Sequence, residues 1–189
     1  MTGPNIYLGT LGLLPRPRLV IGNSKLPITP LVGTFLAGYS SRVEPSTGVH
    51  DELYVRSVVL GKGEERLAVT VADLLGISRY VAARASEAVE DKTGIPRWNV
   101  VVGAVHTHSG PRTSTASMPG KADLRDLVVE AIAGSVAAAD EAKAEAEVRH
   151  GAEVVERVIV NRRDPLGGPS TPGSTRSPSS PPSGAGRSS

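Results

Sequence analysis

The segment Val100–Pro111 reads VVVGAVHTHSGP, and it decides both the expected fold and the expected chemistry of this chain. Its first half is apolar and β-branched, which is typical of a buried β-strand. The segment then passes into two histidines, His106 and His108, and breaks at a Ser-Gly-Pro turn. Side chains at positions i and i+2 of a strand project to the same side. Both imidazoles are therefore expected to line one pocket where the strand ends.

Two imidazoles in one pocket suit a metal site or a general base, because neutral imidazole is a common metal ligand and titrates near neutral pH. The alternative is a pair of hydrogen-bonded loop histidines. Two ligands do not complete a zinc site, so the residues alone leave both interpretations open.

Three nearby features are further candidates for the same site. Asp73 follows the apolar run Leu67–Ala72, and it either orients an imidazole through a hydrogen bond or caps the next turn. His50 is either a third group of the site or a histidine in a surface turn. The segment Gly38–Arg42 combines flexible backbone with a phenol, hydroxyls and a guanidinium. It either binds an oxyanion or polar headgroup or forms an ordinary β-bulge or turn.

The patterns on both sides of this segment predict an α/β fold, a mixed sheet with flanking helices. Strands are expected at residues 18–22, 53–60, 66–73, 98–105 and 148–160, and helices at 79–92 and 124–147, with a loop at 23–30. The second and third strands are expected to form a hairpin. A right-handed crossover through the first helix would make the strands on either side of it parallel.

The 189-residue chain is expected to form one domain over residues 1–165, followed by a disordered tail at residues 166–189. The tail is rich in Ser, Pro and Gly and has no acidic or aromatic residue, so it cannot bury enough apolar surface to offset the entropy of ordering. Its two arginines, Arg176 and Arg187, account for the formal charge of +2. Residues 1–165 therefore carry no net charge, and they show no cluster of Lys and Arg that would indicate nucleic-acid binding.

Other classes of protein are excluded by composition. The chain has no cysteine, which excludes a disulfide scaffold, a thiolate zinc site and a cysteine nucleophile. No apolar run reaches about 18 residues, so no transmembrane segment is predicted. The N-terminus lacks the basic region of a signal peptide, so the sequence leaves the location as cytoplasmic or unknown.

Several sequence pieces occur together in a known order. They are Ile28–Pro30, Ala37–Arg42, Gly48–Arg56, Val71–Asp73, Asn99–Pro111 and Asn161–Arg163. With these pieces, residues 18–165 resemble the N-terminal part of the neutral/alkaline, non-lysosomal ceramidase family. That family hydrolyses the amide bond of N-acylsphingosine and uses a single zinc ion. The resemblance implies that His106 is a zinc ligand, that His108 is a catalytic residue lining the same site, and that ceramide or a related lipid amide is the substrate.

The chain also departs from that family. The resemblance implies a second histidine ligand, a glutamate and a tyrosine from much further along a longer chain, and His150 lies in a different context. The resemblance stops after Pro165, where the tail reads like another frame of GC-rich DNA or a truncated gene model. We therefore expect a fragment that is inactive alone and self-associates through unpaired strand edges. The alternative is a non-catalytic α/β module, or an inactive remnant, that binds a ligand or a partner chain.

Overall fold

The computed structural model describes residues 18–113 and 123–149 of the chain. The elements in chain order are β1 (Leu19–Pro27), β2 (Tyr54–Lys62), β3 (Glu65–Ala72), α1 (Arg79–Thr93), the 3₁₀ turn η1 (Arg97–Asn99), β4 (Val100–Ala104), α2 (Leu124–Glu141) and β5 (Ala144–Glu145). The predicted tail at 166–189 lies outside the described residues, and so does almost all of the predicted strand at 148–160.

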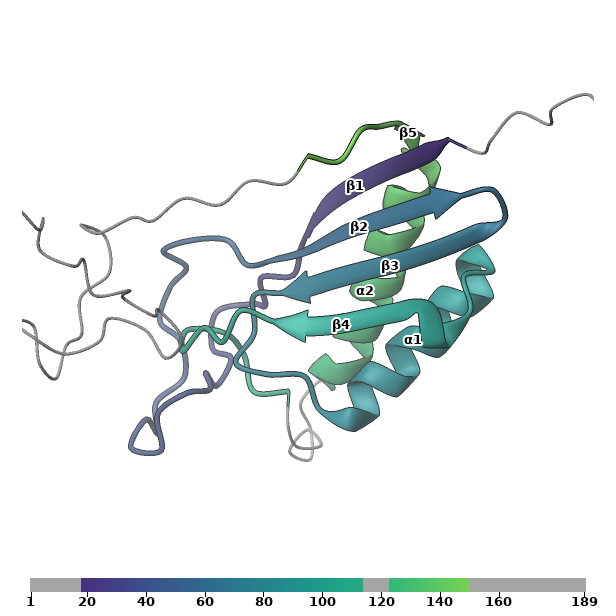
Figure 1. Ribbon diagram of the computed structural model, residues 1–189. Coiled ribbons are helices and arrows are strands. Elements are labelled where there is room, and N and C mark those ends of the chain that lie inside the picture. Colours follow the sequence, from purple (N-terminus) through teal and green to yellow (C-terminus); the bar gives the residue numbers. More distant parts are fainter. Residues whose placement is uncertain (1–17, 114–122, 150–189) are drawn as a thin grey trace, which may run out of the picture. The chain divides into compact units, whose positions relative to one another are not determined.

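The strands form one mixed sheet in the order β4-β3-β2-β1-β5, as the sequence predicts for its class (Figure 1). β2 and β3 are the expected antiparallel hairpin. β3 and β4 are parallel, because the chain crosses between them through α1. This crossover brings the carboxyl end of β4, and the histidines that follow it, beside the end of β3.

Helices α1 and α2 lie on the same face of the sheet (Figure 1). Alternating residues of the central strands point toward them and are buried, among them Val55 and Val59 of β2 and Ala68 and Ala72 of β3. The helices contribute the other half of the core, which includes Val81, Ala85, Val89, Val128, Ile132 and Val136. This alternation is the period of two that places one face of a strand in the core.

The helix ends follow from local chemistry. The Ser78 side chain accepts a hydrogen bond from the Val81 N–H and caps α1, and Gly94 in the left-handed conformation caps its other end. Asp123 caps α2 in the same way by accepting from the Arg125 N–H. Within the described part of the chain, no helix is both long enough and apolar enough to cross a membrane.

Three expected boundaries are wrong. β1 continues to Pro27 through the predicted loop at 23–30, because all nine of its residues pair with β2. α2 ends at Glu141 instead of 147, and the chain then turns back so that β5 pairs with β1. β4 begins at Val100, because residues 97–99 form the turn η1.

Candidate metal and catalytic site

His106 and His108 lie just beyond β4, and their rings converge as expected. The ring centroids are 5.1 Å apart, with an interplanar angle of 67°. The reason for this convergence differs from the prediction, because β4 ends at Ala104 and the two histidines do not continue the strand. His106 has a φ of 67°, in the left-handed region that residues other than glycine rarely adopt. Such strained backbone is concentrated at functional sites in proteins.

The orientation of His106 is set by a backbone carbonyl. Its Nδ1 lies 2.8 Å from the carbonyl oxygen of Leu75, in the loop after β3. A carbonyl oxygen only accepts hydrogen bonds, so Nδ1 carries the proton and Nε2 keeps its lone pair. Metal-ligating histidines in proteins are held by this arrangement. The Leu75 carbonyl could not be recognised from the sequence, because every residue has one.

His108 is held from the other side by the loop that contains Gly38 and Tyr39. The Tyr39 ring meets the His108 ring edge-on, with centroids 4.9 Å apart. Gly38 lies against the same ring, and a Cβ at this position would come within 2.6 Å of His108 Cγ. The Nδ1 atom of His108 is buried and has no hydrogen-bond partner among the described residues. A buried polar atom without a partner is expected to meet a water, an ion or a ligand.

Two arginines tie this loop to the histidine turn. Arg42 donates from Nη1 to the His108 carbonyl oxygen at 2.8 Å and to the Ala37 carbonyl oxygen at 3.3 Å. Arg112 donates to the carbonyl oxygens of Leu36 (3.1 Å) and Arg42 (3.2 Å). The Gly38–Arg42 segment is therefore part of the site, and the Arg42 guanidinium is bonded to backbone. The hydrogen bonds from Arg112 could not be predicted from the sequence, because an arginine after a turn has no distinctive signal.

Among the described residues, no hydrogen bond or ion pair joins Asp73 or His50 to His106 or His108. The Asp73 carboxylate accepts from the Tyr54 N–H (2.9 Å) and from Arg56 Nη1 (2.6 Å), so it braces β2 against the end of β3. These contacts match neither of the two interpretations of Asp73, which were the orientation of an imidazole and the capping of the next turn. The His50 side chain is 97% exposed and lies 2.7 Å from Asp51, which matches the surface-turn interpretation.

The donor chemistry of the pair fits a metal ion only in part. His106 offers Nε2, and His108 offers a second imidazole beside it. Among residues 18–113 and 123–149, however, no group of three or more His, Cys, Asp or Glu side chains is arranged to hold a metal. The described residues thus offer at most two imidazole nitrogens to a metal ion, whereas a zinc site in a protein needs three or four ligands.

Comparison with known proteins places this chain in one family. The profile of the family "Neutral/alkaline non-lysosomal ceramidase, N-terminal" matches residues 19–165, and the chain belongs to this family. The structure is similar to that of the neutral ceramidase from Pseudomonas aeruginosa, with a TM-score of 0.61 and 25% sequence identity. It is also similar to a ceramidase solved in complex with C2, with a TM-score of 0.60 and 25% identity. Each match covers 68% of this chain and 22% of the solved chain, so this chain spans about a fifth of the length of these relatives.

Proposed function

We propose that this chain carries part of the active site of a zinc-dependent amidohydrolase that acts on N-acylsphingosine or a related lipid amide. Its membership of the ceramidase family supports the reaction class and the substrate class. One observation on this chain carries the proposal. The Leu75 carbonyl oxygen accepts a hydrogen bond from Nδ1 of His106, which leaves the lone pair of Nε2 available. Beside this ring lies a second imidazole, whose Nδ1 is buried and has no hydrogen-bond partner within the described part of the chain.

In this proposal, His106 and His108 have different roles. His106 would bind zinc through Nε2, and His108 would exchange a proton with the reacting amide or with water at the same site. A bound zinc ion polarises a carbonyl group and lowers the pKa of a coordinated water. The His108 ring is contacted by Tyr39 and Gly38, and Arg42 donates to the His108 carbonyl oxygen. In this proposal, these contacts would hold the ring beside His106.

We further propose that the complete ligand set is not contained in residues 1–189. Each missing ligand removes a large share of the metal-binding free energy, and binding weakens further at acid pH because imidazole must be neutral to ligate. The chain alone is expected to retain little zinc after dialysis, to lose it at acid pH, and to hydrolyse no measurable ceramide.

Zinc titration by isothermal calorimetry tests the role of His106. His106→Ala is expected to weaken zinc binding by about tenfold or more, whereas His50→Ala, which removes an exposed histidine outside the site, leaves it unchanged. Equal losses in the two variants would contradict the proposal. One tightly held zinc per chain together with robust ceramide turnover would show that the site is complete within these residues.

A second experiment separates the enzyme from a non-catalytic module. The genomic DNA downstream of the Pro165 codon is read in all three frames, and any continuation is joined to this chain and assayed with added zinc. Ceramide hydrolysis that is lost in His106→Ala supports the proposed function. If an extended chain binds ceramide or a partner without turnover, the chain is a binding module.

A further inference from the structure

Strand β4 forms one edge of the sheet, and within the described residues its outer side is unpaired. β4 pairs with β3 on its inner side. Just beyond β4, the Val105 N–H donates a hydrogen bond to the Ala72 carbonyl oxygen of β3 at 3.1 Å. Backbone groups alternate between the two sides of a strand, so the N–H and C=O of Val102 point away from β3. Residues Val100–Ala104 contain no charge and no proline, the features that protect sheet edges from pairing. The edge can therefore accept another strand.

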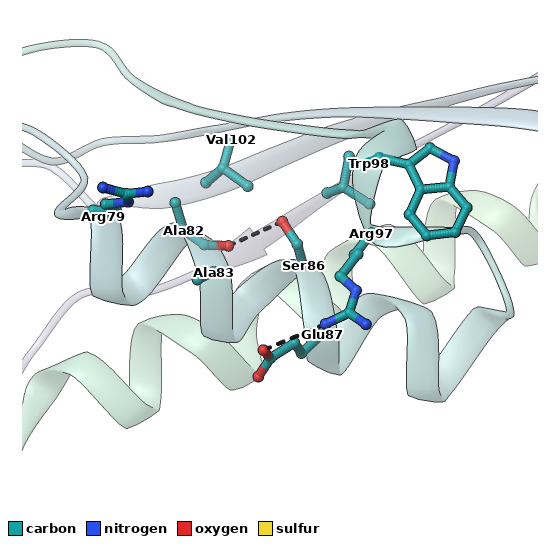
Figure 2. A pocket seen from close by; sticks show the side chains of 9 residues that line it. Arg79, Ala82, Ala83, Ser86, Glu87, Arg97, Trp98 and Val102 are labelled. Atoms are coloured by element: carbon teal, nitrogen blue, oxygen red, sulfur yellow. Dashed lines mark hydrogen bonds and ion pairs between the residues drawn. The ribbon is translucent and has the colours of Figure 1, made fainter.

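A shallow groove of about 510 Å³, open to solvent, lies beside this edge between β4 and α1 (Figure 2). Ala82, Ala83 and Ser86 line it from the helix, and Val100 and Val102 line it from the strand. These helix side chains are small, so they allow another helix to approach closely. Trp98 lies at one end of the groove and is 76% exposed. Tryptophan is enriched among the residues that dominate protein–protein binding energy.

The charges along the groove are self-complementary. Arg79 and Glu87 both line it, four residues before and four residues after Ala83. Arg79 has no ion-pair partner in the described part of the chain. Glu87 lies at a loose 3.7 Å from each of Arg84 and Arg97. A two-fold axis near Ala83 would place two α1 helices antiparallel, with each Arg79 opposite the other copy's Glu87.

We propose that a second copy of this chain docks at this groove. The two β4 strands pair antiparallel with Val102 opposite Val102, so that one sheet continues through both copies. The two α1 helices meet through Ala82 and Ala83, and two Arg79–Glu87 ion pairs close the contact. The occupant is a second copy because this surface is complementary to itself. The unpaired edge of β4 can pair with the same edge of another copy, and Arg79 can pair with the other copy's Glu87. Such self-complementarity is the property of an isologous interface.

Sedimentation equilibrium on the full 189-residue chain tests this arrangement through a charge exchange. Arg79→Glu and Glu87→Arg are each expected to raise the dimer dissociation constant about tenfold or more, because each places like charges together twice per dimer. The double variant Arg79→Glu/Glu87→Arg restores opposite charges, and its dissociation constant should return to within about threefold of wild type. Lys62→Glu, a charge reversal at the far end of β2, serves as the control and leaves dimerisation unchanged.

Val102→Pro tests the strand edge, because it removes the outward N–H without touching the hydrogen bonds to β3. Circular dichroism establishes whether Val102→Pro folds. If it does not fold, the Arg79→Glu and Glu87→Arg variants test the proposal without it. A wild-type chain that stays monomeric at several hundred micromolar would overturn the proposal. The proposal would also be overturned if the single charge reversals left the dimer dissociation constant unchanged, or if the double variant failed to restore it.

Discussion

At the scale of single residues, the site depends on backbone contacts that hold two imidazoles. His106 occupies the left-handed region at a cost of roughly 1–3 kcal/mol for a residue other than glycine. The hydrogen bond to Leu75 O and the contacts of the following turn offset this cost. Among these contacts, the Thr107 N–H donates to Leu74 O at 3.1 Å. The position of the ring is therefore determined by the end of β3, which lies about thirty residues earlier in the chain.

Gly38 offers a test of how tightly the loop holds His108. Gly38→Ala is expected to destabilise the fold by about 2–3 kcal/mol, because φ is 108° and the added Cβ would overlap His108. Urea unfolding measures the loss, and the NMR signals of His108 should shift. Gly48→Ala is the matched control, since nothing lies within 4 Å of a Cβ at that position. An equal cost at both positions would contradict the packing described here.

At the scale of elements, α2 is joined to the sheet by a chain of hydroxyl groups, of which those of Ser57, Thr70 and Ser135 are buried. Ser135 of α2 lies 2.8 Å from Ser57 Oγ of β2 and 2.6 Å from Ser24 Oγ of β1. Ser57 in turn donates to Thr70 of β3 at 2.8 Å. A helix packed on a sheet through hydroxyls is sensitive to the loss of one member, because a buried polar group without a partner is costly.

Ser135→Ala is expected to lower the free energy of unfolding by about 1 kcal/mol, since it leaves Ser57 one partner short. Ser86→Ala is the control, because in residues 18–113 and 123–149 the hydrogen bond of the Ser86 hydroxyl goes to Ala82 O of its own helix. Its effect should stay within about 0.5 kcal/mol. Chemical denaturation of both variants makes the comparison. A control that loses as much as Ser135→Ala would show that the hydroxyl chain contributes nothing specific.

The start of α2 predicts a dependence of stability on pH. The side-chain hydrogen bond from Arg125 chiefly lowers the pKa of Asp123, and the Arg125 backbone N–H lowers it further. A lowered pKa means that Asp123 stabilises the fold above about pH 4, and that this contribution is lost as the pH falls through the folded-state pKa.

Asp123→Asn keeps an acceptor at the cap and removes the charge. The variant should unfold at a lower temperature than wild type at pH 7, and the two should converge in acid. Thermal unfolding followed from pH 7 to pH 2 measures the gap, and Asp91→Asn, an exposed change on α1, controls for net charge. If the difference in unfolding temperature persisted unchanged at pH 2, the charge of Asp123 would not be its cause.

At the scale of the whole molecule, both helices cover one face of the sheet and leave apolar side chains on the other. Val58, Leu67 and Val101 are 38%, 41% and 53% exposed on that second face. Exposed apolar faces and open edges favour association. The proposed dimer covers the β4 edge, and it leaves this second face as it is.

The composition of residues 166–189 predicts that they contribute nothing to the melting temperature. Deleting them is expected to leave the midpoint unchanged in differential scanning calorimetry, because a segment rich in Ser, Pro and Gly supplies no core. A drop of several degrees would show that this segment packs against the rest of the chain.

The sequence by itself determined the class of fold, the hairpin of β2 and β3, and the crossover from β3 to β4 through α1. It also determined that His106 and His108 lie together at the end of a strand. Each of these follows from local signals, such as the alternation in β2 and β3 and the cap at Ser78. It also carried the family resemblance, because Val100–Pro111 and its flanking motifs are contiguous pieces of chain.

Only the tertiary structure decided how the site is held and where the elements end. β1 extends to Pro27 because β2 pairs with it, and α2 stops at Glu141 because the chain turns back to β1. Asp73 bonds Arg56 instead of an imidazole, while a carbonyl at Leu75 takes the orienting role. These outcomes depend on backbone groups and on residues brought together from distant parts of the chain. Local sequence patterns encode the preferences of neighbouring residues and contain no record of such contacts.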